Sequence, residues 1–369
     1  MFAVCYDLLY VVQPHQLLEA MYFFIAVMAV VILFIAFYVV NRAGRSSRRE
    51  QLRGVYSEWI SQLAICEGEE ELQQTTDDVL AQMQSSRLAM SRFGSDILIK
   101  ELVTAAKSIS GTAGQNISYF YTKAGLDRFS LERLKSGFWH IKASAIQTLA
   151  QLNQKQYITK IYRHANHPNE LVRNEARVAV VKLTGFEGLR FLDVISYPLT
   201  EWEQLCLLHE LAEHHHPNFK DIPDWLHSDN DSVVEFALAL VESYRIYDLH
   251  GDVAFCLAHQ QPFIRKKAVR TLGAINQQAT AGLLVSQLQK EEEEVQLIVL
   301  EVMGKTGTEN ELPVLWPFLS HPHTPFKIAA ARAIRNSHPY GLMLLQQRVN
   351  KEEYPWHILL PQLEEEVNA

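Results

Sequence analysis

Histidine and glutamate gather in HELAEHHH, residues 209–216, the stretch of this chain that comes closest to a metal-binding motif. In a zinc-peptidase helix, two histidines four residues apart share one face with a glutamate between them. Here position 213 is glutamate, and His209 and His214 are five residues apart on different faces. His214, His215 and His216 are typical of a solvated helix end that binds metal only adventitiously. We therefore expect no functional metal site and no cofactor.

Other catalytic chemistry has no signature in the sequence. The four cysteines lie far apart without a CxxC pair, which fits neither a disulfide framework nor a cysteine-rich zinc site. No G-x-S-x-G motif, Walker lysine loop, dinucleotide fingerprint or EF-hand ligand series is present. The 369 residues are 48% apolar, which excludes disorder as the main state, and the net charge of −8 argues against nucleic-acid binding. We expect a protein that is not an enzyme, with no nucleic-acid partner and no identifiable small-molecule substrate.

An uninterrupted apolar segment runs from Ala20 to Val40 without a charged residue. As a helix it is about 31 Å long, which matches a hydrocarbon core of about 30 Å. A cleaved signal peptide is disfavoured, because residues 1–19 contain no lysine or arginine and the apolar stretch is long. A buried core helix seldom needs so many uninterrupted apolar residues. The segment therefore predicts one transmembrane helix.

Charge is distributed unequally around this segment. Only Asp7 and Glu19 precede it, whereas five arginines follow it closely. Basic residues beside a span stay in the cytoplasm, so we expect a single-pass inner-membrane protein with its N-terminus outside and its C-terminal part cytoplasmic. The arginines can also contact anionic lipid head groups, at about 1 kcal/mol each. They are Arg42, Arg45, Arg48, Arg49 and Arg53.

Beyond residue 137 the chain repeats itself about every 31 residues. Each unit contains one apolar residue, here called the reference residue. A mostly small residue follows it by four positions and a mostly apolar residue by eight, so the three share one helix face. The reference residues are Ile141, Val172, Trp202, Val233, Ile264, Val295 and Phe326.

Each unit is predicted to be a hairpin of two short helices. From the second unit on, an apolar pair lies eleven and seven residues before the reference residue, and Pro168, Pro198, Asp229 and Pro322 mark turns four residues before it. One hairpin cannot bury its own apolar face, so the units must stack. In the third unit Glu210 falls at a core position, which predicts a one-residue slip or a local kink. The predicted fold class is an all-α solenoid of helical hairpins, an armadillo-like superhelix, preceded by one transmembrane helix.

The second helices resemble HEAT repeats, whose second helix commonly reads V-R-x-x-A-x-x-A-L. The resemblance lies in LVRNEARVAVVKL (171–183), FIRKKAVRTLGAI (263–275) and FKIAAARAIRNS (326–337). It covers about residues 138–349, as seven units and part of an eighth. The short period is similar to a compact bacterial form that also occurs in phycobilisome lyase subunits. Residues 119–152 look like the opening of membrane-anchored bacterial HEAT proteins.

A basic residue follows the reference residue in four of the seven units, at Lys142, Arg173, Arg265 and Lys327. In HEAT proteins this position often forms a ladder of contacts between neighbouring repeats, and the resemblance favours that interpretation. The alternative is a basic stripe on the inner surface that receives an acidic segment of a partner protein. The candidate residues of this basic stripe are Arg173, Arg177, Arg265, Lys266, Arg270, Lys327 and Arg332.

The sequence predicts four segments along the chain. They are a short extracytoplasmic terminus (1–19), the transmembrane helix (20–40), a basic juxtamembrane segment with a helical spacer (41–137), and the repeat array with its cap (138–369). Within the spacer, amphipathic stretches on either side of Gly94 predict two helices, and GTAGQN at 111–116 predicts a loop. The last residues, EYPWHILLPQLEEEVNA, predict a cap on the final hairpin.

These features predict a membrane-anchored cytoplasmic scaffold or adaptor that binds protein partners. A stacked array presents an extended concave surface, and an anchor confines that surface beside other membrane proteins. Resemblance to membrane-anchored bacterial HEAT proteins implies a membrane-associated partner, such as a glycosyltransferase of an exopolysaccharide-synthesis assembly in the envelope. Two alternatives stay open: a lyase-like HEAT-repeat enzyme acting on a tetrapyrrole-type ligand, and a regulator of a membrane transporter or receptor.

Overall fold

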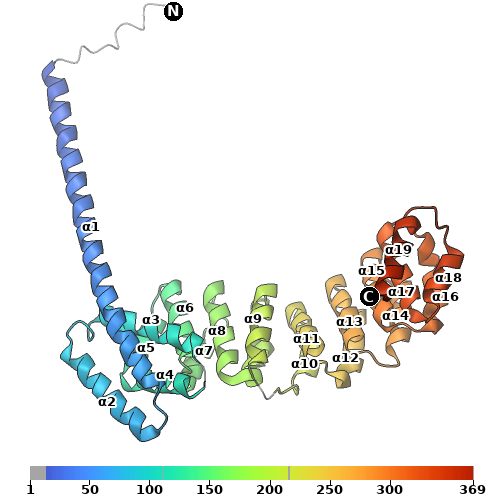
Figure 1. Ribbon diagram of the computed structural model, residues 1–369, viewed down its shortest axis with the longest axis horizontal. Coiled ribbons are helices and arrows are strands. Elements are labelled where there is room, and N and C mark those ends of the chain that lie inside the picture. The colour runs from blue at the N-terminus through green and yellow to red at the C-terminus, as the bar shows by residue number, and fades with distance from the viewer. Residues whose placement is uncertain (1–13, 110, 215–216, 369) are drawn as a thin grey trace, which may run out of the picture. The chain divides into compact units, whose positions relative to one another are not determined.

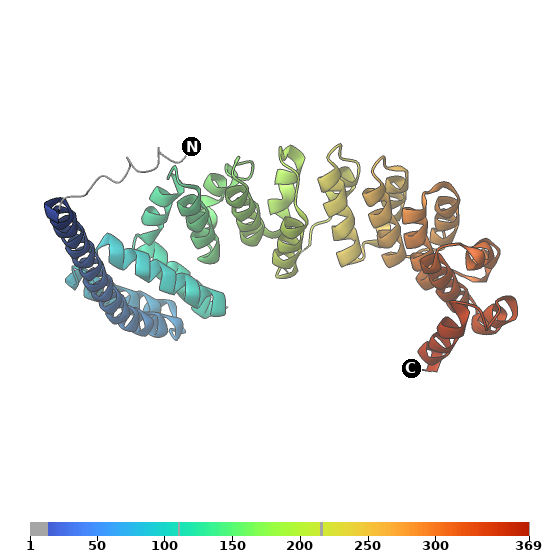
Figure 2. The ribbon, with the colours of Figure 1, turned by 90° about the horizontal axis from the view of Figure 1, so that it is seen from above.

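The computed structural model describes residues 14–109, 111–214 and 217–368. Helices account for most of this part of the chain, and it contains no strand. Backbone contacts divide the chain into two units, Met1–Ser136 with Gln151–Gln154 and Gly137–Ala150 with Lys155–Ala369. In the second unit paired helices follow one another in a row (Figures 1 and 2). The fold is an all-α solenoid, as the repeat predicts.

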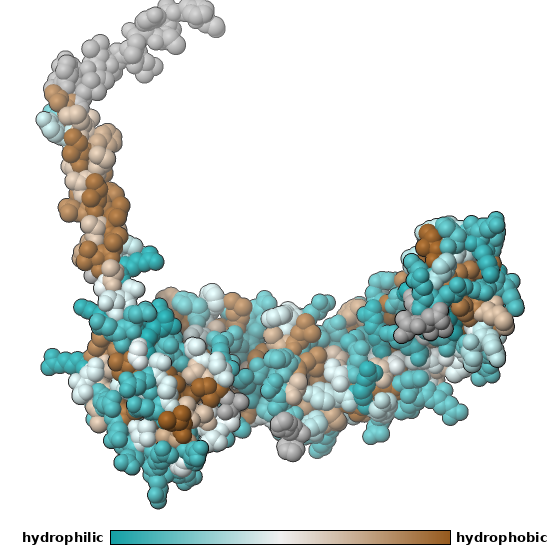
Figure 3. Space-filling model, in the orientation of Figure 1, coloured by the Kyte–Doolittle hydropathy of each residue, from teal (hydrophilic) through white to brown (hydrophobic). Residues whose placement is uncertain are grey.

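The first unit is built on a single 51-residue helix, α1 (Pro14–Ala64). Residues 20–40 lie in its first half with their side chains exposed, and Figure 3 shows the apolar surface that they form. The second half buries one face against the other helices of the unit. The buried residues are Leu52, Tyr56, Trp59, Ile60 and Leu63. The other helices are α2 (Glu69–Ser85), α3 (Arg92–Ser108), α4 (Thr112–Lys123) and α5 (Leu126–Leu134).

The predicted loop at 111–116 is wrong, because α4 begins at Thr112. Its Asn116 is buried and donates two hydrogen bonds from Nδ2, to the carbonyl oxygens of Leu63 at 3.0 Å and Cys66 at 2.9 Å. Carbonyl groups at a helix C-terminus lack partners within the helix. Asn116 therefore supplies donors where α1 ends, and the glycine and asparagine that suggested a loop belong to a helix start.

The predicted break at Gly94 is also displaced. Residues 86–91 separate α2 from α3, and Gly94 lies in the first turn of α3. Its hydrogen atoms face the preceding turn so closely that a Cβ there would lie 2.6 Å from the carbonyl oxygen of Ala89. Glycine is required at this position by close packing and not by a change of chain direction.

The second unit consists of hairpins whose second helices are long and regular. These second helices are α6 (Trp139–Gln151), α8 (Glu170–Thr184), α9 (Glu201–Ala212), α11 (Asp231–Tyr244), α13 (Pro262–Ala274), α15 (Glu293–Thr306) and α17 (Thr324–Ser337). Most first helices are much shorter, and the one in the third unit is a 3₁₀ helix. They are α7 (Ile158–Tyr162), η2 (Gly185–Val194), α10 (Ile222–Leu226), α12 (His250–Phe255), α14 (Thr280–Lys290) and α16 (Leu312–Leu315).

Short 3₁₀ segments extend several first helices, and two helices close the array. The 3₁₀ segments are η1 (Lys155–Tyr157), η3 (Tyr247–Leu249), η4 (Cys256–Ala258), η5 (Glu309–Glu311) and η6 (Trp316–Ser320). The closing helices are α18 (Gly341–Arg348) and α19 (Trp356–Asn368). Leu359, Leu360 and Leu363 of α19 are buried, and α19 packs against α17 and α18. The cap expected at the C-terminal end is present.

From Val172 on, the reference residues lie in the core except in the third unit, whereas Ile141 of the first unit is half-buried. In the third unit Trp202 is 71% exposed, so its assignment is wrong. The core position belongs to Glu203, which is 1% exposed, and is followed by the fully buried Leu207 and Leu211. The predicted one-residue slip is confirmed: Glu203 restores the spacing of 31 residues from Val172. This repeat therefore carries a carboxylate where the others carry an apolar side chain.

One apolar core runs through the stacked hairpins from Ala165 to Leu363. Capping residues start several second helices where the repeat places a turn. The side chains of Asn169, Thr200 and Asn230 each accept a hydrogen bond from a backbone N–H in the first turn of the helix that follows. These caps fix where each second helix begins, and so which of its residues face the core.

Candidate interaction surface

Arg177 is the most deeply buried member of the predicted basic stripe. It is fully buried on α8, where its Nη1 donates to Oε1 of Glu203 at 2.9 Å. Its Nε donates to the carbonyl oxygen of Ala165 at 2.9 Å, and its Nη2 to that of Tyr197 at 3.1 Å. Burial lowers the pKa of Arg177, and the Glu203 carboxylate opposes this shift. The assignment of Arg177 to a partner-binding stripe is therefore wrong, because the side chain joins two repeats inside the array.

Arg173, one turn earlier on α8, is also mostly buried, at 9% exposed. Its Nη1 donates to the carbonyl oxygen of Pro168 at 3.1 Å, and its guanidinium lies over the ring of Tyr197 at 4.5 Å from the centroid. Tyr197 belongs to the next repeat. Arg173 thus packs between repeats and offers little cationic surface to a partner.

The residue after the reference residue makes the ladder that the HEAT resemblance implies. Arg265 forms a two-point ion pair with Glu291, at 2.6 and 2.9 Å, which reaches from α13 to the following repeat. In the third unit this position is Gln204, once Glu203 is taken as reference, and its Nε2 donates to Glu235 of the next repeat at 3.0 Å. Such contacts match adjacent repeats to each other and use the side chains that would otherwise attract an acidic partner.

The remaining members of the stripe differ in exposure. Lys266 forms an ion pair with Glu294 of the next repeat, and Arg270 is exposed on α13. Lys327 is half-buried on α17, and Arg332 is exposed beside a hollow of about 440 Å³ between α15 and α17. The structure therefore does not bring the seven residues together as one cationic surface.

The five arginines that follow the apolar segment lie along α1. Arg42, Arg48 and Arg49 are exposed, whereas the side chain of Arg45 lies outside the described part of the structure. The Nε of Arg53 is 2.7 Å from Oε1 of Glu101 on α3. Arg53 therefore connects α1 to the bundle.

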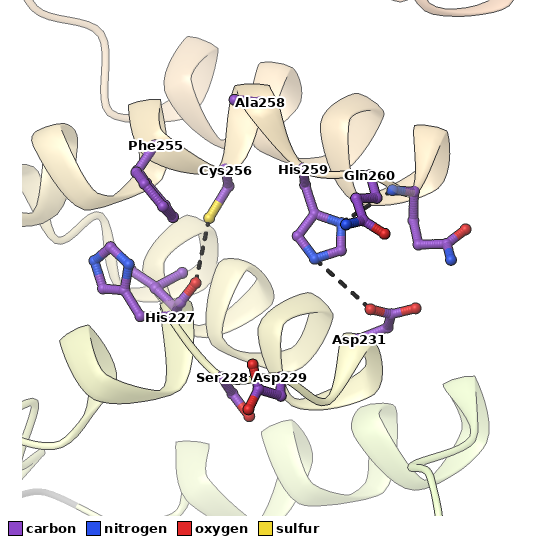
Figure 4. Close-up of a pocket in the computed structure, with 11 residues that line it drawn as sticks. His227, Ser228, Asp229, Asp231, Phe255, Cys256, Ala258, His259 and Gln260 are labelled. Atoms are coloured by element: carbon purple, nitrogen blue, oxygen red, sulfur yellow. Dashed lines mark hydrogen bonds and ion pairs between the residues drawn. The ribbon is translucent and has the colours of Figure 1, made fainter.

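A pocket of about 410 Å³ lies between the turns that join α10 to α11 and α12 to α13 (Figure 4). His227, Asp229, Asp231, Phe255 and His259 contribute to its wall. Asp231 points toward His259, with 3.6 Å between Oδ1 and Nε2. Of these residues the repeat pattern singled out only Asp229, as a turn residue, and the acidic residues that recur two positions before a reference residue were a usable signal for Asp231.

Metal binding finds no further support in the described residues. No group of three or more histidine, cysteine, aspartate or glutamate side chains within them is placed to hold a metal ion. His209 is exposed and His214 half-buried on α9 or directly after it, whereas His215 and His216 lie outside the described residues.

Comparison with known families concerns the C-terminal half of the array. Residues 253–335 match HEAT repeats. The matched segment runs from α12 to α17 and contains the ladder pair Arg265–Glu291. It supports the resemblance drawn from the second helices, and HEAT repeats in general form surfaces for binding other proteins. No curated protein matches the chain.

Three solved structures align with most of this chain at low sequence identity. An engineered protein is 13% identical over 85% of this chain and 99% of its own, with a TM-score of 0.40. Human deoxyhypusine hydroxylase in complex with glycerol is 12% identical over 80% and 98%, with a TM-score of 0.30. A designed armadillo repeat protein in complex with the peptide (KR)4 is 13% identical over 76% and 98%, with a TM-score of 0.21. At these TM-scores the similarities support no functional argument.

Proposed function

We propose that this chain is a membrane-anchored scaffold whose repeat array binds protein partners and performs no catalysis. The observation that carries the proposal is the first half of α1, where residues 18–40, almost all apolar, are exposed. Exposing so large an apolar surface to water is energetically unfavourable, and burial in a lipid bilayer removes that cost. The same helix continues into a folded bundle, so the bilayer and the protein fold share one element.

The orientation follows from the arginines. Arg42, Arg48 and Arg49 stand exposed within about 14 Å of the end of the apolar stretch, where retention in the cytoplasm is strongest. We place the N-terminus outside the cytoplasm and the array on the cytoplasmic side of the inner membrane. A partner in the same membrane is present at a high effective concentration near the array, so a surface of low affinity suffices for binding. An envelope protein, such as a glycosyltransferase of an exopolysaccharide assembly, would meet this requirement.

The membrane anchor is tested by a double substitution, Leu33→Lys with Ile35→Lys, in the full chain. Each lysine near the middle of a span costs about 2.5–3.5 kcal/mol for insertion, so the variant should leave the membrane fraction. The matched control is Ile65→Lys, which changes a residue that is 75% exposed beyond the end of α1. Retention of both variants in the membrane would contradict the anchor. A second experiment, with a reporter, tests the orientation: a reporter that works only outside the cytoplasm is fused after Ala369, and its activity would contradict the orientation.

Partner binding is tested by crosslinking the full chain in cells and purifying it from detergent-solubilised membranes. The expected result is one membrane protein recovered in stoichiometric amount with the wild-type chain. It should be depleted with the Leu33→Lys, Ile35→Lys variant, because loss of the anchor removes the partner's proximity. Equal recovery with both chains would show that the membrane does not confine the interaction.

A further inference from the structure

Three of four successive second helices expose an apolar side chain at an equivalent position, the exception being α11, where the equivalent residue is the buried Ser232. One residue before the reference residue stand Leu171 on α8, Trp202 on α9 and Phe263 on α13, which are 52%, 71% and 41% exposed. Leu205, one turn after Trp202, is 60% exposed. These four residues form what is here called the apolar row. The caps and the core fix the rotation of each second helix about its axis. The register that buries the reference residues therefore also exposes the apolar row.

Carboxylates accompany the apolar row. Two residues before the reference residue stand Glu170 and Glu201, both exposed, and Asp231. Attraction to the helix dipole accounts for an acidic residue in a first turn, but it does not account for the exposed apolar neighbour. Asp229 and Glu235 add two further carboxylates around Phe263, in an open hollow of about 640 Å³.

The cations near the row are already paired with carboxylates. On α13, Arg265 contacts Glu291, Lys266 contacts Glu294 and Lys267 contacts Glu242. Arg173 and Arg177 are buried between α8 and the following repeat. The charge offered to an approaching molecule around the row is therefore negative, which is the reverse of the sign expected from the basic residues of the sequence.

The row extends from α8 and α9 past α11, which contributes no apolar member, to α13. The Gln204–Glu235 hydrogen bond and a bond from the backbone nitrogen of Leu199 to Oγ of Ser232 join the third repeat to the fourth. Helices pack about 8–10 Å apart, so the row is about 25–30 Å long. An extended chain covers that distance with about nine residues.

We propose that the apolar row and its carboxylates bind a short extended segment of a partner protein that carries lysine or arginine next to apolar side chains. The proposal rests on the scaffold function and specifies the chemistry of its partner. The apolar side chains of the partner segment cover Trp202, Leu205 and Phe263. Its lysine or arginine side chains pair with Asp229, Asp231 and Glu235. A second copy of this chain has a net charge of −8 and presents the wrong sign.

The test is a selection from a displayed library of random peptides of about 12 residues, long enough to cover the row. The target is the full chain in nanodiscs of zwitterionic lipid, which does not attract cationic peptides by itself. Selected peptides should be enriched in lysine or arginine together with leucine, isoleucine or aromatic residues. Enrichment of acidic peptides, or of none, would overturn the proposal.

Two sets of substitutions locate the binding of the best selected peptide by fluorescence anisotropy. W202S with L205S and F263S, and separately D229N with D231N and E235Q, should each weaken binding about tenfold or more. The matched controls are Y340S with M343S, which are 64% and 48% exposed near the other end of the array, and E352Q. Thermal unfolding of each variant verifies the fold. If both sets leave the affinity unchanged, the row is not the site, whereas the scaffold function still stands on the crosslinking result.

Discussion

Arg177 joins two repeats through hydrogen bonds that no apolar side chain could replace. It reaches one carbonyl oxygen in its own hairpin, another in the next repeat, and the carboxylate of Glu203. The Oε2 atom of Glu203 in turn accepts a hydrogen bond from the backbone nitrogen of Thr200, at 3.1 Å, as part of a capping box. The buried pair therefore couples the register of α8 to the start of α9.

Removing one partner of this pair should be more harmful than removing both. Arg177→Met leaves the Glu203 carboxylate buried without its cation, and such losses cost about 3–5 kcal/mol. Arg177→Met with Glu203→Leu restores an apolar residue at the reference position, so its cost should fall short of the sum of the two single costs by about 0.5–3 kcal/mol. Hydrogen exchange of α8 and α9 in the full chain measures the opening free energies. Additive costs would show that the pair is not coupled.

His164 makes the array sensitive to acid. Burial, with smaller contributions from Lys142 and His167, lowers its pKa from 6.5 to about 4. Between these values the unfolded chain binds a proton that the folded chain does not, so stability is complete above pH 6.5 and declines as the pH falls toward 4. His167, whose pKa is also lowered by burial and by Lys142, acts in the same direction.

Hydrogen exchange of α7 between pH 7 and pH 4.5 tests this effect. The wild-type chain should lose opening free energy as the pH falls, and His164→Gln should lose less because it removes the titrating group. Lys142→Met should also reduce the loss, since a neighbouring positive charge no longer opposes protonation of the imidazole. Identical pH profiles for the three chains would contradict the assignment.

The sequence indicated the slip in the third unit but not the role of Arg177. Glu210 at a core position indicated a one-residue slip, because a carboxylate is rarely buried without a reason. Arg177 was grouped with the surface basic stripe, because its partner lies 26 residues later and becomes visible only after the slip is applied. An acidic residue at a reference position, one repeat after an arginine, is the signal that would have identified the pair.

At the level of helices, the second helices were predictable and the first helices only partly so. The second helices carry an apolar residue every fourth position and are 12 to 15 residues long. Most first helices are four to six residues long, which is too short for a periodic pattern to define them, and α10 and α16 contain proline. Helix α4 was missed because its start is rich in glycine and asparagine, and its stability comes from a distant contact with the end of α1.

Two glycines in the first unit should respond oppositely to alanine. Gly94→Ala would place Cβ 2.6 Å from the carbonyl oxygen of Ala89 and still closer to that of Leu88, so α3 must move away from the preceding turn. We expect a loss of about 1–3 kcal/mol. Gly54→Ala meets nothing within 4 Å inside α1 and should gain up to about 1 kcal/mol. Thermal unfolding of the full chain in detergent compares the two variants, and a stable Gly94→Ala protein would show that this packing is loose.

At the level of the whole molecule, the repeat period established the solenoid, but the charge of its surface was not predictable from the sequence. Basic residues were visible at one position of the repeat, whereas their carboxylate partners Glu203, Glu291 and Glu294 lie about one repeat away and at no single position. Pairing between repeats decides which charges remain available. The exposed Trp202 was hidden for a related reason, since the slip had assigned it to the core.

Because α1 passes from its apolar stretch into the bundle without a break, the number of residues between Val40 and Leu52 sets a rotational phase. One inserted residue would turn the bundle by about 100° about the helix axis and raise it by about 1.5 Å. Seven inserted residues would return it to within about 20° of its present facing. A molecule that rotates or tilts the apolar half of α1 would rotate or tilt the bundle with it. The continuous helix can therefore transmit rotation in addition to positioning the bundle.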